Sequence, residues 1–176
     1  MIEVLRLGHR PFRDKRISTH VCLTARAFGA SKVYYSGNKD EVMEKTILRI
    51  VKEFGGDFSV EYAENAEKLI INKKREGFSI VHLTVYGKGV LEKIKEIRKE
   101  KNLLIVVGGA KVEPVFYELA DFNISVTNQP HSEVASLAII LDKYFNEKEF
   151  SLDFKNAKRK IIGVEKGKKI DLMQSN

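Results

Sequence analysis

The hydrophobic positions along the chain follow two alternating patterns. Short apolar runs, each typical of a strand, alternate with longer segments in which apolar residues recur every three or four positions, as on one face of a helix. The predicted strands are residues 2–7, 32–35, 58–62, 79–84, 103–107 and 123–126. The predicted helices are residues 18–28, 40–54, 65–75, 90–99, 114–119 and 132–145.

This alternation predicts an α/β fold in which a parallel sheet is flanked by helices on both faces. Residues 103–107 are apolar without alternation, as expected for a strand buried on both sides. The segment 132–145 is apolar almost all round, so we expect it to be enclosed by protein on nearly every side, in part by a second subunit.

The chain shows no internal repeat and no Pro/Gly-rich linker. We therefore predict one domain over residues 1–150, followed by a short basic C-terminal extension over residues 151–176. That extension has two interpretations, a hairpin that turns at Lys166 and Gly167 or a basic tail that becomes ordered on binding.

The net charge of +7 is concentrated at the two ends of the chain. Residues 1–30 have a net charge of +4, residues 151–176 also have +4, and the 120 residues between them have −1. Such asymmetry indicates contact with a polyanion, nucleic acid first and an anionic membrane second. The alternative is a solvated basic surface with no partner.

Several classes of protein are disfavoured by what the sequence lacks. It has no run of about 20 apolar residues, as a transmembrane helix needs, and its first residues do not resemble a signal peptide. The single Cys22 can form no internal disulfide, which predicts a cytoplasmic protein. No His/Cys cluster has the spacing of a zinc site, so no metal is expected. Neither a complete GxGxxG motif nor a P-loop is present.

Three segments follow predicted strands, at the edge where parallel sheets bind ligands. Residues 8–17 form a basic loop, GHRPFRDKRI. Residues 108–113 begin with two glycines, which let a ligand approach the backbone closely, although an ordinary turn has the same pattern. Residues 127–131, TNQPH, concentrate hydrogen-bonding groups before a helix, where an elaborate N-terminal cap is the alternative interpretation.

Taken together, these segments resemble a known family. The stretches LRLGHRPFRDKRISTHVCLTARAFGA, VHLTVYG and VVGGAKVEPVFYELADFNISVTNQPHSEVASLAIILD are similar to archaeal tRNA cytidine-56 2′-O-methyltransferases, which belong to the SPOUT superfamily. The resemblance covers roughly residues 1–154. It implies methyl transfer from S-adenosyl-L-methionine (SAM) to a ribose of tRNA, a homodimer whose two subunits build one tRNA site, and a C-terminal trefoil knot. Knots are so rare that the pattern of strands and helices predicts none.

The resemblance also implies which residues hold the cofactor, mostly through backbone groups of the loops that form the knot. They are Leu83, Gly108, Gly109, Ala110, Lys111, Val112, Val126, Thr127, Asn128, Gln129, Pro130, His131, Ser132 and Glu133.

The catalytic motif departs from that of related SPOUT ribose methylases, which have an asparagine and an arginine in an N-x5-R pattern ahead of AFG. In this chain those two positions hold Ile17 and Leu23. A DPR element of the related enzymes matches DKR at residues 14–16, so Arg16 is the candidate catalytic arginine, with Arg10 and Arg13 behind it. The alternative functions are a SPOUT methylase that acts on a base or on another RNA, and a non-catalytic RNA-binding domain.

Overall fold

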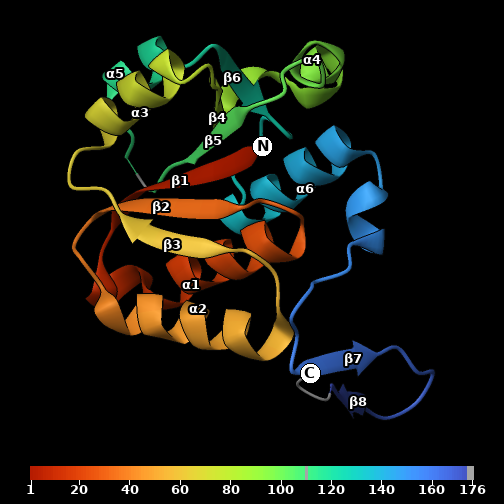
Figure 1. Ribbon diagram of the computed structural model, residues 1–176. Coiled ribbons are helices and arrows are strands. Elements are labelled where there is room, and N and C mark those ends of the chain that lie inside the picture. Colours follow the sequence, from red (N-terminus) through yellow and green to blue (C-terminus); the bar gives the residue numbers. More distant parts are fainter. Residues whose placement is uncertain (110, 174–176) are drawn as a thin grey trace.

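The computed structural model describes residues 1–109 and 111–173, without the side chains of residues 14 and 15. Six strands form one sheet in the order β3-β2-β1-β5-β4-β6, and every neighbouring pair is parallel. The predicted parallel sheet is therefore confirmed (Figure 1). The strands are β1 (Ile2–His9), β2 (Lys32–Gly37), β3 (Ser59–Tyr62), β4 (Ser79–Gly89), β5 (Leu103–Val107) and β6 (Phe122–Ser125).

Helices cover both faces of this sheet, as predicted (Figure 1). One apolar core lies between the sheet and the helices α1, α2, α4 and α6, and a second core lies between the sheet and α3 and α5. The central β5 is buried along its whole length, as its unbroken apolar run predicts. The helices are α1 (Pro11–Ala27), α2 (Glu41–Phe54), α3 (Ala66–Arg75), α4 (Val90–Ile97), α5 (Pro114–Leu119) and α6 (Glu133–Phe145).

The first helix begins seven residues earlier than the predicted residue 18. Most of the segment 8–17, which we expected to be a loop, is therefore the start of α1, and that expectation is wrong. The physical reason is Pro11 at the first helical position, where its fixed φ suits the helix and its missing N–H costs no hydrogen bond. As a result Arg13 and Arg16 lie about one turn apart on the same helix.

Strand β4 also runs further than predicted, to Gly89 instead of residue 84. Its pairing with β6 shifts register between Leu83 and Lys88, so residues between them bulge from the ladder. The side-chain amide of Asn128 donates hydrogen bonds to the backbone oxygens of Val85 (2.6 Å) and Gly87 (3.3 Å) and fixes the bulge.

Helix α6 is less enclosed than its sequence indicated. Leu137, Ile140 and Leu141 are buried in the core, but Ala135 and Ile139 are exposed, and Ile139 keeps 41% of its surface. The single chain thus encloses α6 only in part, where it packs on α1, α4 and the sheet, and cover of its exposed side by a second subunit stays a prediction.

The C-terminal extension contains a two-stranded antiparallel hairpin, β7 (Arg159–Ile162) and β8 (Lys169–Leu172), after a short 3-10 helix, η1 (Lys148–Ser151). The hairpin interpretation of this segment is thus confirmed. Figure 1 shows the hairpin set apart from the main sheet. It is attached near the C-terminal end of α2, where Glu53 pairs with Arg159 at 3.0 Å. None of the described helices is long and apolar enough to span a membrane.

Candidate functional site

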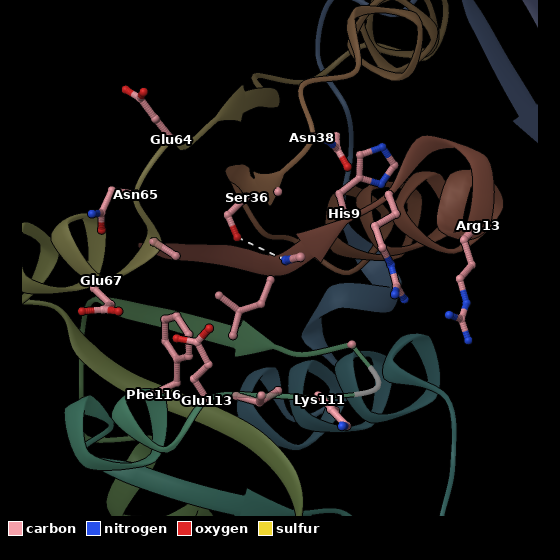
Figure 2. Close-up of a pocket in the computed structure, with 17 residues that line it drawn as sticks. His9, Arg13, Ser36, Asn38, Glu64, Asn65, Glu67, Lys111, Glu113 and Phe116 are labelled. Atoms are coloured by element: carbon pink, nitrogen blue, oxygen red, sulfur yellow. Dashed lines mark hydrogen bonds between the residues drawn. The ribbon is translucent and has the colours of Figure 1, made fainter.

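Two neighbouring clefts lie where the strands end. The first, which we call the loop cleft, has a volume of about 690 Å³ and lies among the ends of β4 and β5 and the start of α6. The second, the strand-end cleft, has about 760 Å³ and lies at the ends of β1 and β2 beside the starts of α3 and α5 (Figure 2). The residues that line both clefts are Arg10, Arg13, Gly109, Lys111 and Val112.

The structure brings seven of the predicted cofactor residues to the loop cleft. They are Leu83, Gly108, Gly109, Lys111, Val112, His131 and Glu133. Ala110 lies outside the described residues. The described residues that line the loop cleft do not include Val126, Thr127, Asn128, Gln129, Pro130 or Ser132. Two of these have structural contacts instead, since Asn128 fixes the bulge of β4 and the Ser132 hydroxyl accepts a hydrogen bond from Val134 N (3.2 Å) at the start of α6.

The two glycines after β5 leave no room for side chains. A β-carbon at Gly108 would collide with the side chain of Val112, and one at Gly109 would lie 3.3 Å from Nη1 of Arg6. Glycine at both positions therefore lets Val112 and Arg6 pack close to the backbone, while both glycines line the loop cleft. A cradle of this kind suits an adenine or ribose that is held by backbone amides and carbonyls.

Arg6 is a residue of the loop cleft that the sequence analysis missed. It lies inside β1 with 1% of its surface exposed, donates to the backbone oxygen of Leu7, and pairs with Glu133 at 3.3 Å. Because a buried charge is costly unless it is paired, this contact ties the end of β1 to the first turn of α6. The available signal was an arginine in the middle of a strand whose neighbouring positions, Val4, Leu5 and Leu7, are apolar.

His82 is a second missed residue of this cleft. Its Nδ1 lies 2.8 Å from Oδ1 of Asn123, whose amide nitrogen donates to the backbone oxygen of Tyr117 at 2.9 Å. Oδ1 is thus the acceptor, and Nδ1 of His82 carries the proton. Burial lowers the pKa of His82, and the hydrogen bond to Asn123 opposes this only in part, so the ring is neutral.

The three candidate arginines are placed differently. Arg10, at the N-terminal cap position of α1, and Arg13, one turn later, line both clefts. Arg16 is exposed and, within the described part of the chain, contributes to the lining of neither cleft. In Figure 2 the Arg13 side chain extends from α1 on the far side of His9 from the acidic residues.

A buried hydrogen-bond network fixes the start of α1. His9 Nδ1 lies 2.7 Å from Oγ of Ser18, and Nε2 lies 3.2 Å from Oδ2 of Asp40. Burial by itself would raise the pKa of Asp40, but hydrogen bonds from Met43 N–H and His9 outweigh it and lower that pKa. The network therefore joins β1, α1 and the start of α2, and it holds Arg10 and Arg13 at the cleft border.

Neither cleft provides an evident metal site. Among the described residues, no group of three or more His, Cys, Asp or Glu side chains is placed to bind a metal ion.

Comparison with known proteins gives one clear family. A family model for tRNA ribose 2′-O-methyltransferase, aTrm56, matches residues 54–171. A tRNA (cytidine(56)-2′-O)-methyltransferase of Methanopyrus kandleri is 48% identical over 168 residues, which cover 96% of this chain and 94% of the relative. Proteins of the same name from Nitrosopumilus maritimus and Thermococcus kodakarensis are 45% and 48% identical, covering 99% and 97% of this chain and 98% and 96% of their own.

Solved structures share the fold at lower identity. A TrmH/SpoU tRNA modifying enzyme of A. aeolicus superimposes with a TM-score of 0.62 at 18% identity, covering 85% of this chain and 78% of its own. The SpoU methyltransferase AviRb of Streptomyces viridochromogenes, in complex with AdoMet, gives 0.60 at 12% identity, covering 84% and 60%. At such identities the likeness is evidence of the fold alone.

Proposed function

We propose, on the premise that this chain belongs to the aTrm56 family of tRNA ribose 2′-O-methyltransferases, that it transfers the methyl group of SAM to the 2′-hydroxyl of cytidine 56 in the T loop of tRNA. The observation that supports this most is identity of 45–48% to enzymes of that name over nearly the whole length of both chains. The basic N-terminal residues beside the clefts and the basic hairpin suit a polyanionic substrate.

The loop cleft fits SAM on two grounds. Gly108 and Gly109 line the cleft with no side chains of their own, and the cleft walls come from the three segments that the family resemblance implies. Leu83, Gly108, Gly109, Lys111, Val112, His131 and Glu133 would hold the cofactor there. The remaining predicted residues, from Val126 to Pro130 and Ser132, would act by holding the shape of the loops.

When bound, SAM supplies a methyl group on a positively charged sulfur. Transfer of that group to the 2′-oxygen would leave S-adenosylhomocysteine, with the hydroxyl proton passing to solvent. The task of the protein is to align the two atoms and keep water out, which can supply a large share of the rate. Arg10, Arg13 and Lys111, at the border of both clefts, are placed to hold a ribose phosphate there.

We propose Arg16 as a further group at the reacting centre, acting in the cleft of a partner subunit. This suits its exposed position outside the clefts of its own chain and the DKR element that matches the family. A guanidinium has a pKa above about 12, so its natural role is bidentate contact with phosphate and not proton acceptance.

The proposed enzyme is a homodimer. The exposed Ala135 and Ile139 on α6 offer an apolar strip that a second copy would cover. We also propose the trefoil knot of the SPOUT superfamily, formed where the segment after β6 contacts the bulge of β4 through Asn128. Residues 151–176 act in this proposal as a basic extension to the methyltransferase domain of residues 1–150, and the cytoplasm is the expected location.

The test is methylation of a tRNA transcript by the purified protein with SAM, followed by mapping of 2′-O-methylated riboses. We expect a single new modification at cytidine 56. A methyl group on a base, or on another nucleotide, would refute the assignment. Failure to bind SAM in calorimetry would favour a non-catalytic RNA-binding domain.

A further inference from the structure

The strand-end cleft is larger than the loop cleft, and most of the residues that line it are not among the proposed cofactor residues. It opens at the ends of β1 and β2, and its far wall is formed by the starts of α3 and α5. Five residues that line it also line the loop cleft, including Gly109 and Lys111. A ligand whose reacting group lies at this shared border therefore has a second cavity directly beside it.

The two sides of the strand-end cleft differ in charge. Arg10, Arg13 and Lys111 lie at the shared border, whereas Glu67 and Glu113 lie on the opposite side (Figure 2). Neither carboxylate forms a side-chain hydrogen bond or an ion pair with another described residue, so both negative charges are available to a ligand. Carboxylates repel a phosphate, which favours a nucleotide that enters with its phosphate at the basic border and its base on the acidic side.

The floor of the cleft on that side is apolar. Leu7 is buried, and Val112 and Phe116 are half-buried. Phe116 N donates to the backbone oxygen of Glu113 at 3.1 Å, which places the two side chains as neighbours on the first turn of α5. An aromatic ring beside a hydrogen-bond acceptor is the combination that proteins use to hold an unstacked base of RNA.

We infer that the strand-end cleft receives the base of the target nucleotide, with its ribose at the border to the loop cleft, and that Glu113 accepts a hydrogen bond from the amino group of that base. This inference rests on the proposed function. Cytosine presents an amino donor where uracil presents a carbonyl oxygen, and a carboxylate accepts from the first and repels the second. Glu113 therefore selects cytidine over uridine.

The experiment compares single-turnover methylation rates on two tRNA transcripts that differ only in having C or U at the target position. Glu113→Gln removes the charge and adds a donor that suits uracil. We expect it to lower the C-to-U ratio of rates by about tenfold, the value of one charge-assisted hydrogen bond. Glu118→Gln is the matched control, since Glu118 is an exposed residue of the same helix that lines neither cleft among the described residues.

Comparing ratios removes any effect of the U substitution on tRNA folding, because every variant meets the same two RNAs. An unchanged ratio for Glu113→Gln overturns the inference, whether the two rates stay as they were or fall equally. SAM affinity, measured by calorimetry, should be the same for both variants and the original chain. If the original chain methylates neither RNA, the proposed function itself fails, which is a different result from an unchanged ratio.

Discussion

Replacement of Gly109 by valine is the sharpest test of the cofactor cradle. The first added carbon would lie 3.3 Å from Nη1 of Arg6, inside the optimal separation of about 3.5–4.0 Å for such atoms. The two methyl groups of valine extend about 1.5 Å further and must enter the cleft or press on the guanidinium. Overpacking of this kind costs about 1–3 kcal/mol. We expect SAM affinity to fall at least about tenfold, which corresponds to about 1.4 kcal/mol.

The assay is calorimetric titration with SAM, with thermal unfolding of the same samples to establish that the variant is folded. Gly163→Val is the matched control, because a β-carbon there meets nothing within 4 Å. Gly109→Ala should show a smaller loss than valine, since it adds the first carbon alone. Unchanged SAM affinity in folded Gly109→Val would refute the assignment of this glycine to the cofactor site.

Four further predictions test the proposed dimer, the catalytic arginine, the hairpin and the buried network. Arg16→Ala should reduce single-turnover methylation by ~100-fold or more while SAM affinity persists; near-normal turnover would pass the role to Arg10 or Arg13. The original chain should sediment as a dimer at micromolar concentration, and Ile139→Glu, which places a charge in the exposed strip of α6, as a monomer; a monomeric original chain would exclude the interface. Replacing the three lysines of residues 166–169 by glutamine should weaken tRNA binding and reduce the slope of log affinity against log salt by up to about 2–3. An identical slope would indicate that the hairpin is solvated and does not contact the tRNA. The pKa of Asp40 is lowered in the folded state, so the stability that its carboxylate contributes is present above its unfolded pKa of about 4 and is lost as pH falls through the folded pKa. The unfolding free energy of Asp40→Asn should lack this acid dependence. Identical pH profiles for the variant and the original chain would contradict the prediction.

The sequence by itself determined most of the secondary structure and the fold class. Apolar periodicity depends on neighbours within a few residues, so the strands and helices from β2 to α6 were predicted with small errors at their ends, except for β4, which runs five residues further. The long apolar run of β5 also predicted a strand buried on both faces, because burial on both sides removes the need for alternation. The start of α1 was missed because residues 13–16 are all charged, so the first turns of the helix show no apolar periodicity.

The residues of the candidate site were likewise predicted from the sequence only in part. The glycines at 108 and 109 and the segment around His131 could be found by their order along the chain, since they follow strand ends and match a family. The pairing of Arg6 with Glu133 could not be found from the sequence. The two residues are 127 positions apart and become neighbours only when β1 packs beside β5.

The tertiary structure alone decided which side chains share a cleft. Periodicity states which face of a strand or helix is apolar, but it does not state which strand lies next to which. The order β3-β2-β1-β5-β4-β6 places the end of β1 beside the loop after β5, and so brings Arg10 and Arg13 to Lys111. It also leaves Arg16 outside both clefts of its own chain. Strand order depends on the packing of all helices on both faces at once, a property that no local stretch of sequence encodes.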